Sequence, residues 1–478
     1  MSRIPRPRRV SAGLAAATLA LTSLSAATAY AAPLDDPTPG PLMNYVINTK
    51  ASPGHVRKVE DAVKDAGGTV LSSYREFGVV VAQSTNANFK VDVRAGRNGR
   101  EVQSVGATRT AAVSEGAAGG LSSVGSVGSV GSVDETTATP VLDPQEGSQW
   151  DMVQIKADQA HNVTDGSRRV LVGINDSGVD DTHPDLAPNF DARDSVSCVK
   201  NGVPDQTPGI WRPTTSPHGT HVAGTVAAAR NGIGIVGVAP GVRIASVKVV
   251  NDAGFIYPEY SICGIVWAAE HHMDVTNHSY FIDPFQFWCK DNGDQGAVQE
   301  AVRRAYAWAA DRGTLSVAAA GNSNYDLANK TTDTTSPNDS TPVSRTINND
   351  CLDMPTELPG VITVASTTQL RVKSSFSNFG LHKIDVAAPG SSILSTLPGG
   401  GYGLMSGTSM ASPHVTGIAA LLKSTHPWWG PRDLERALQR EADDTACPTT
   451  PDPRCTGTTA NNAFYGEGIA DALDAVHR

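Results

Sequence analysis

The sequence predicts an α/β fold from about Trp150 to the C-terminus, with a mostly parallel sheet that carries helices on both faces. Two observations predict it: short apolar segments typical of buried strands, and segments of helix length that separate them. Strands that alternate with helices favour a parallel sheet covered on both sides. The expected strands are 169–175, 244–250, 314–319, 361–365 and 384–386, and the expected helices are 218–229, 258–272, 296–312, 412–423 and 431–441.

A small α+β unit is expected ahead of this fold, over residues 43–113. Apolar stretches at 45–47, 70–71 and 79–81 are typical of strands, and residues 55–66 have a helical pattern between the first two. About 70 residues is small for independent stability. The unit shows no catalytic group, and a small binding domain is one interpretation of it.

Residues 114–145 have the composition of a flexible linker and separate this unit from the domain at 146–478. They are rich in Gly, Ser, Ala and Thr and contain a run of Val-Gly-Ser repeats from Val124 to Val133. Such a segment buries too little apolar surface to offset the entropy of ordering it. We expect proteolytic maturation to occur here.

The N-terminus has the three regions of a secretory signal peptide, over residues 1–32. Residues 1–9 hold four arginines and no acid, residues 10–24 are small and apolar, and cleavage is expected after Ala31 or Ala32. No cysteine follows the apolar run, and no later segment reaches 18 consecutive apolar residues. The expected product is secreted and extracellular, without a membrane anchor.

Charge and cysteines narrow the function further. Lys and Arg total 38 and Asp and Glu total 48, so without the four signal arginines the net charge is 34 minus 48, or −14, which disfavours a nucleic-acid ligand.

The six cysteines include no Cys-x-x-Cys pair, so disulfides are favoured over zinc. Proximity predicts Cys447 with Cys455, and elimination favours Cys289 with Cys351 and Cys198 with Cys263.

Three motifs supply the parts of a nucleophilic catalyst. Asp176 lies in Asn-Asp-Ser-Gly, His218 opens His-Gly-Thr-His-Val-Ala-Gly, and Ser409 lies in Gly-Thr-Ser-Met-Ala-Ser-Pro-His. A serine hydroxyl needs an imidazole to take its proton and a carboxylate to orient that imidazole. The order Asp, His, Ser differs from the chymotrypsin order and from that of α/β-hydrolases, which disfavours an esterase or lipase.

These motifs, together with Ala318–Asn322 (Ala-Ala-Ala-Gly-Asn) and Val386–Gly390 (Val-Ala-Ala-Pro-Gly), resemble the subtilisin-like serine peptidases from about Trp150 onward. The resemblance implies a secreted serine endopeptidase that works through an acyl-enzyme, needs no cofactor for catalysis, acts as a monomer on proteins or peptides, and is autoprocessed from a zymogen. Residues 43–113 match the position of the family's propeptide, which inhibits the enzyme intramolecularly. A subtilisin-fold aminopeptidase and a non-catalytic binding protein remain as alternatives.

The family also implies roles for further residues. Asn322 matches its oxyanion asparagine, with the Ser409 backbone N–H as a second donor. Pro413, shortly after Ser409, is a residue with which a helix can begin, which puts the nucleophile near a helix N-terminus. Substrate-binding positions match Ser279, Tyr280, Phe281, Ala319 and Gly321. Tyr280-Phe281 replaces the family's common Leu-Gly, so these aromatics either narrow the cleft or alter its side-chain preference, or they cover the core.

Two regions bear on stability and access. The segments around Asp185 and Asn231 match those that hold a structural calcium in many relatives, and both side chains offer oxygens that calcium prefers. Ordinary polar groups of turns are the alternative interpretation.

The insertions 282–294 and 323–350 are long for loops inside a domain, so we expect them at the rim of the site, held there by a disulfide.

Overall fold

The computed structural model describes residues 40–114 and 142–477. Its main sheet has seven strands in the order β15-β14-β10-β8-β5-β7-β6, and every neighbouring pair is parallel. This confirms the predicted α/β class. The strands are β5 (Leu171–Asp176), β6 (Val196–Ser197), β7 (Arg243–Lys248), β8 (Val275–His278), β10 (Leu315–Ala319), β14 (Val361–Thr367) and β15 (Val386–Pro389). The expected signal peptide, 1–32, and residues 115–141 of the expected linker lie outside the described residues.

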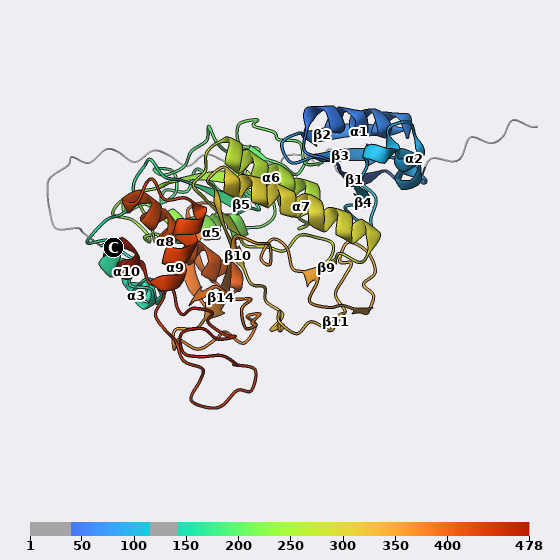
Figure 1. Cartoon of the computed structure of the whole chain (residues 1–478). Helices are drawn as coiled ribbons and strands as arrows, with labels where there is room; N and C mark the ends of the chain where they lie inside the picture. Colours follow the sequence, from blue (N-terminus) through green and yellow to red (C-terminus); the bar gives the residue numbers. More distant parts are fainter. Residues whose placement is uncertain (1–39, 115–141, 478) are drawn as a thin grey trace, which may run out of the picture. The chain divides into compact units, whose positions relative to one another are not determined.

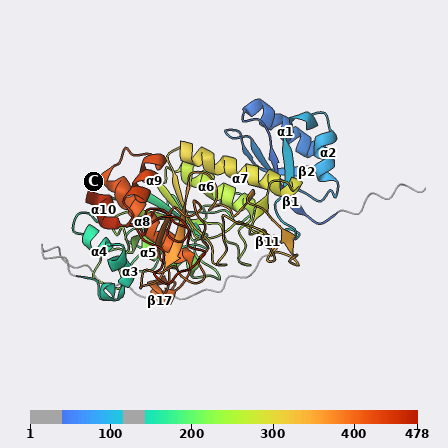
Figure 2. The same ribbon diagram turned by 60° about the horizontal axis from the view of Figure 1, so that its bottom comes forward.

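Helices cover both faces of this sheet, because alternate residues of each strand point to opposite sides. Val172 and Ile174 of β5 pack with α5 (His218–Ala227) and α8 (Thr408–Thr425), whereas Leu171 packs with α6 (Pro258–Glu270). Helix α7 (Gly293–Asp311) lies beside α6 in both views (Figures 1 and 2). The strands are therefore buried on both faces, which explains their continuous apolar runs.

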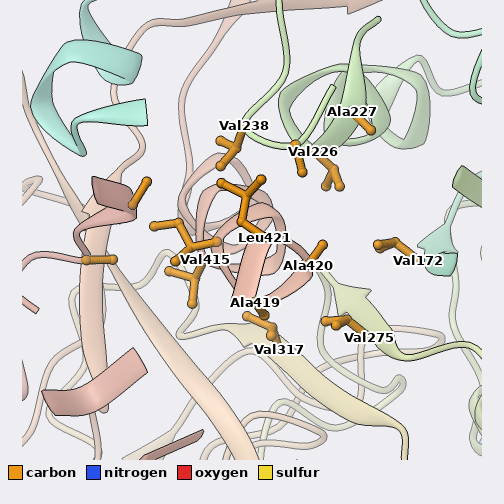
Figure 3. Packing of buried hydrophobic residues seen from close by; sticks show 14 of the residues in the cluster. Val172, Val226, Ala227, Val238, Val275, Val317, Val415, Ala419, Ala420 and Leu421 are labelled. Carbon is orange, nitrogen blue, oxygen red and sulfur yellow. The ribbon is translucent and has the colours of Figure 1, made fainter. Parts of the chain in front are cut away.

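Helix α8 passes through the centre of the domain. All its residues from Thr408 to Leu422 are buried, so it lacks the polar face of a surface helix. Figure 3 shows Val415, Ala419 and Leu421 of this helix surrounded by valines from the sheet and from the segment after α5. The rigid packing of α8 matters because Ser409 lies in its first turn.

The region at 43–113 folds as an α+β unit with a four-stranded antiparallel sheet in the order β2-β3-β1-β4. Its elements are β1 (Met43–Asn48), α1 (Pro53–Asp65), β2 (Gly68–Tyr74), β3 (Val79–Ser84), α2 (Phe89–Ala95) and β4 (Ser104–Ala107). The three expected strands and the helix are present. Helix α2 and strand β4, which the sequence pattern did not reveal, complete the unit.

Both faces of this small sheet are covered. Tyr45 and Ile47 of β1 pack with α1, while Val46 packs in one cluster with Val298 and Val302 of α7. Strand β4 approaches the start of α7 so closely that a Cβ on Gly106 would lie 2.3 Å from the carbonyl oxygen of Asp294. The helices α6 and α7 thus supply part of the core that this small unit lacks by itself.

Three disulfides join Cys198 to Cys263, Cys289 to Cys351 and Cys447 to Cys455, which confirms all three predicted pairings. The second links β9 (Trp288–Cys289) to β13 (Cys351–Leu352), so it ties the two insertions together. The other elements are β11 (Thr332–Asp333), β12 (Arg345–Thr346), β16 (Ile393–Leu397), β17 (Gly401–Met405), α3 (Trp150–Gln154), α4 (Ala157–Ala160), α9 (Pro431–Arg440), α10 (Ala472–His477), η1 (Gly99–Glu101) and η2 (Glu146–Ser148). Within the described ranges, no helix is both long and apolar enough to cross a bilayer.

Candidate functional site

Asp176 and His218 form the first pair of the candidate site. Asp176 is the last residue of β5 and is 1% exposed, and His218 is the first residue of α5. His218 Nδ1 lies 2.8 Å from Oδ1 and 3.0 Å from Oδ2 of Asp176. Gly219 permits this approach, since a Cβ there would lie 2.5 Å from the carbonyl oxygen of Gly178 and 3.1 Å from Cβ of Asp176. The carboxylate therefore fixes the imidazole with Nε2 left to face outward.

The environment of His218 favours its protonated form. Burial lowers the pKa of the imidazole, but the charge of Asp176 and the hydrogen bond to it oppose this effect, and the net result is a raised pKa. The side chain keeps 29% of its surface exposed, so it can exchange a proton with a bound molecule. An imidazole that can both accept and return a proton suits general acid–base catalysis.

Ser409 lies in the first turn of α8, because the helix begins at Thr408 and not at Ser412 as expected. Pro413 is therefore inside the helix. A proline there has no N–H for the carbonyl four residues earlier, which is that of Ser409. The hydroxyl of Ser279 fills the gap and donates to this carbonyl oxygen over 2.8 Å. The start of α8 is thus fastened to the segment after β8.

Ser409 is 9% exposed, and its hydroxyl donates a hydrogen bond to a backbone oxygen. Among the described residues its acceptor is the backbone oxygen of Ser279, 3.2 Å away, and not His218. Hydrogen bonds between a nucleophile and its base are often loose without substrate and tighten when one binds. Rotation about one side-chain bond is enough to turn this hydroxyl elsewhere.

Two hydrogen-bond donors converge beside Ser409. The Oδ1 atom of Asn322 accepts from the N–H of Thr408 over 2.8 Å and from its hydroxyl over 2.9 Å, which leaves the amide group Nδ2 free to point outward. Both this Nδ2 and the backbone nitrogen of Ser409 lie 3.5 Å from the position that a Cβ on Gly407 would occupy. The Ser409 N–H has no acceptor in its own helix, since it belongs to the first turn. The arrangement can hold a negatively charged oxygen.

The five predicted substrate-binding residues fall on two segments. Ser279, Tyr280 and Phe281 follow β8, and Ala319 ends β10, with Gly321 two residues later. Gly321 has φ +98°, and its N–H donates to the hydroxyl of Thr408 over 3.0 Å. Ser279 exchanges hydrogen bonds with Ser409 in both directions. The structure therefore places both segments against the start of α8.

Tyr280 and Phe281 are both half-buried, and Tyr280 belongs to an internal polar cluster. Its hydroxyl lies 2.9 Å from Nδ1 of His278 and 3.4 Å from the hydroxyl of Tyr306 on α7. Burial lowers the pKa of His278 to about 3 and raises that of Tyr280 to about 12, so both are neutral at physiological pH. For Tyr280, this favours the interpretation in which the aromatic ring covers the core.

Sequence reasoning missed three residues at the site: Thr408, Gly407 and Asp353. Thr408 fixes both Gly321 and Asn322, and Gly407 leaves open the space in front of the two donors. Both stand in the motif around Ser409, so the motif itself was the available signal. Asp353 lies 56 positions before Ser409 and no local pattern marks it, although it reaches the neighbourhood of Gly321.

Asp185 and Asn231, the predicted calcium ligands, are satisfied by the protein itself except for one oxygen. Oδ2 of Asp185 accepts from the N–H of Ile235 over 3.1 Å and from the hydroxyl of Tyr402 over 2.8 Å, and only its buried Oδ1 has no partner among the described residues. Asn231 donates to the carbonyl of Pro184 and accepts from the N–H of Ile233. Calcium takes six to eight oxygens, and the hydrogen bonds already use Oδ2 of Asp185 and the side chain of Asn231, so a calcium ion here stays a prediction.

The loop that Asn231 begins is held from a second side. Asp143 accepts from the N–H groups of Asn231 and Gly232, and the side-chain amide of Gln149 bonds both the N–H and the carbonyl of Val236. Side-chain carboxylate and amide groups thus form hydrogen bonds with backbone groups of the loop 231–236. The conformation of this loop has an explanation in hydrogen bonds alone.

Comparison with known proteins gives consistent matches. A sequence model described as the subtilase family matches residues 167–468. Subtilisin NAT of Bacillus subtilis subsp. natto is 35% identical over 323 residues, which cover 67% of this chain and 69% of that protein. A subtilisin of Bacillus pumilus is 36% identical over 289 residues, with 60% of this chain and 89% of that protein covered.

Solved structures match over most of the chain. The epidermin leader peptide processing serine protease of Staphylococcus aureus superposes with a TM-score of 0.67 at 21% identity, covering 92% of this chain and 98% of that one. Fervidolysin of Fervidobacterium pennivorans, a keratinolytic enzyme related to subtilisin, gives 0.64 at 22% identity, covering 92% and 62%. At these identities the two structures support the fold alone.

Proposed function

Because this chain belongs to the subtilase family and is a serine-type peptidase, we propose that it is a secreted endopeptidase with Asp176, His218 and Ser409 as its triad. The observation that carries the proposal is the fixed Asp176–His218 pair at the start of α5, together with a serine in the first turn of α8, a buried helix that packs in the same cluster as α5. A binding protein on this fold would have no need to keep all of these groups.

The proposed reaction begins when Ser409 Oγ attacks the carbonyl carbon of the scissile peptide bond. Its proton passes to Nε2 of His218, while Asp176 stabilises the imidazolium. Asn322 Nδ2 and the Ser409 N–H donate to the oxygen that becomes negative. His218 then gives the proton to the leaving amine, the C–N bond breaks, and an acyl-enzyme ester remains. A water molecule, deprotonated by His218, hydrolyses this ester and restores Ser409.

Residues 43–113 act, in this proposal, as a propeptide that the enzyme removes by cutting within 114–145. The support is the packing of this unit on α6 and α7 and the composition of the linker. The signal-like residues 1–32 support export to the extracellular space, where disulfides persist. Substrates are extracellular proteins or peptides, nucleic acid has no part, and the mature enzyme acts as a monomer without a catalytic cofactor.

The test compares the secreted wild type with Ser409→Ala and with the control Ser406→Ala, which removes an exposed hydroxyl three residues earlier. We expect wild type and control to lose roughly the first 110 to 145 residues and to cut an unfolded protein at internal bonds. The Ser409→Ala chain should stay full length and inert. Release of single N-terminal residues would instead favour the aminopeptidase, and identical processing of all three chains without hydrolysis would overturn the proposal.

A further inference from the structure

Asp353 is a buried acid with no partner for its charge. It directly follows strand β13 and is 2% exposed, and burial and neighbouring charges, with no hydrogen bond from the described residues, act on its carboxylate. An ionised carboxylate buried without a partner is unfavourable, so such groups usually serve a structural pair or a ligand. The carboxylates around it show no such deficit.

The charged neighbours of Asp353 are already paired with one another. Oε1 of Glu357 accepts from Lys330 over 2.7 Å and from Lys383 over 3.0 Å, and its Oε2 accepts from the backbone N–H of Asp353 over 2.8 Å. Asp333 pairs with Arg345. The nearby lysine, Lys330, is therefore hydrogen-bonded to Glu357, and among the described residues no cation is hydrogen-bonded to Asp353.

Asp353 lies between the two candidate substrate-binding segments. Its Oδ2 is 3.6 Å from the position that a Cβ on Gly321 would occupy. The carbonyl of the next residue, Met354, accepts from the N–H of Ile282 over 2.8 Å, and Ile282 directly follows Phe281. One hydrogen bond and one close approach thus join the Asp353 segment to both segments, next to Asn322.

We propose that Asp353 binds the side chain of a lysine or arginine in the substrate, at the residue whose carbonyl Ser409 attacks. This inference rests on the proposed function. The attacked carbonyl oxygen lies at Asn322 and the Ser409 N–H, so the side chain of the same residue branches beside Gly321, where Asp353 is found. Lys and Arg carry their charge at the end of a long apolar stem, so their charged groups can reach the carboxylate of Asp353 between the two segments.

The energetics favour a cation over other side chains at this position. Burial raises the pKa of Asp353, the charge of Glu357 raises it further, and Lys330 opposes both. An arriving ammonium or guanidinium group supplies the partner that the free enzyme lacks and stabilises the ionised carboxylate. A leucine or phenylalanine would bury the carboxyl further without a partner, and a glutamate would bring a like charge.

The experiment measures kcat/KM of the full chain, after whatever processing it performs, on blocked peptides that differ only at the residue before the scissile bond. The panel holds Arg, Lys, citrulline, Phe, Leu and Glu. Citrulline matters because it has nearly the shape of arginine without its charge. We expect Arg and Lys to exceed citrulline, Phe and Leu by about 100-fold, and Glu to be the poorest.

Two variants separate recognition from structure. Asp353→Asn keeps the size and removes the charge, and it should lower kcat/KM for Arg and Lys by about 100-fold while citrulline, Phe and Leu change little. The control Asp350→Asn makes the same charge change on an exposed side chain three positions earlier and should leave the panel unaltered. Benzamidine, a cation that mimics arginine, should inhibit the wild type competitively, whereas neutral benzamide should not. That measurement needs no variant to fold.

The outcomes distinguish the two proposals. Equal or better cleavage after Phe or Leu by the wild type, with no inhibition by benzamidine, overturns the role of Asp353 and leaves the serine endopeptidase intact. An equal loss on all substrates in Asp353→Asn assigns the residue a structural role and also overturns the inference. Absence of cleavage on the whole panel and on an unfolded protein contradicts the proposed function itself.

Discussion

At the scale of single residues, the proposed mechanism makes activity depend on pH through His218. The imidazole must be neutral to accept the proton of Ser409, and Asp176 raises its pKa above the ordinary value of about 6.5. The acidic limb of kcat/KM therefore has its midpoint above that pH, and activity rises as His218 loses its proton. A pH–rate profile on a small peptide amide measures this midpoint directly.

Asp176→Asn tests the cause of the shift. Without the carboxylate, only burial acts on the imidazole and lowers its pKa, so the acidic limb moves to lower pH. The rate itself should fall by about 10⁴-fold, because the imidazole loses its orienting partner. His382→Asn removes an exposed imidazole and serves as the control with an unchanged profile. A limb that stays in place in Asp176→Asn assigns the titration to another group.

Gly407→Ala tests the two converging donors. The added methyl lies 3.5 Å from both Asn322 Nδ2 and the Ser409 nitrogen, which is ordinary contact, so the fold tolerates it. It occupies the space that the negatively charged oxygen needs. We expect kcat to fall by about 100-fold with an unchanged thermal midpoint. Kinetics on a peptide amide and a melting curve give the two quantities.

Gly401→Ala is the matched control for this variant. Its methyl meets only Cβ of Leu397, at 3.8 Å, on a hairpin near the start of α8 in sequence. Full activity in the control and loss in Gly407→Ala support the oxyanion role. A fully active Gly407→Ala chain shows that the oxygen binds elsewhere.

Among the elements, the loop at 231–236 illustrates how a hydrogen-bond network fixes a surface segment. Tyr402→Phe removes one of the two donors to Oδ2 of the buried Asp185. A lost hydrogen bond to a charged group costs about 1.5 to 3 kcal/mol, so the thermal midpoint should decrease. If these hydrogen bonds alone hold the loop, a chelator should leave the midpoint of the wild type unchanged. Calorimetry with and without chelator checks both, and a large drop on chelation contradicts this account.

Helix α8 shows which features of the elements a sequence reveals. Its existence follows from the apolar pattern, but proline favours the first turn of helices, so the expected start was Ser412. The real start at Thr408 depends on the hydroxyl of Ser279, which satisfies the carbonyl that Pro413 cannot reach. That contact joins residues 130 positions apart, and no local pattern predicts it. The sequence pattern did not reveal α2 and β4, because each is short and has only two buried residues, too few to form a recognisable apolar pattern.

The candidate site divides in the same way. Asp176, His218, Ser409 and Asn322 stand in short motifs, and the structure pairs Asp176 with His218 and fixes Asn322 to Thr408, next to Ser409, while their catalytic roles stay a prediction. Asp353 has no such motif, because its position beside Gly321 arises only when β13 and the segment after β10 meet in space. The hydrogen bond that Asp185 accepts from Tyr402 likewise has no local signal, because Tyr402 lies 217 positions after Asp185.

At the scale of the whole molecule, one buried ion pair connects the N-terminal unit to the larger domain. Arg109, just after β4, pairs with Glu259 in the first turn of α6, and both side chains are at most 1% exposed. Asn44 donates to the same carboxylate over 2.8 Å, and the guanidinium lies 3.6 Å from the ring centre of Tyr257. Removal of one partner from a buried pair leaves the other charge uncompensated.

Arg109→Ala should therefore destabilise the full chain by about 3 to 5 kcal/mol. The measurement is the urea midpoint in a Ser409→Ala background, which we expect to stay in one piece. Lys90→Ala breaks an exposed ion pair with Asp294, which also joins the N-terminal unit to the larger domain. This variant should lower the free energy of unfolding by less than about 1 kcal/mol. Equal effects of the two variants contradict a special role for the buried pair.

The reciprocal hydrogen bonds between Ser279 and Ser409 have a mechanical consequence. The proposed nucleophile belongs to one residue of this pair, and the segment proposed to hold the peptide begins at the other. Because these two hydrogen bonds connect α8 to that segment, we expect the two to be displaced together. The gap between nucleophile and bound carbonyl then varies less than the position of either one. The distance between the reacting atoms therefore depends less on fluctuations of the surrounding structure.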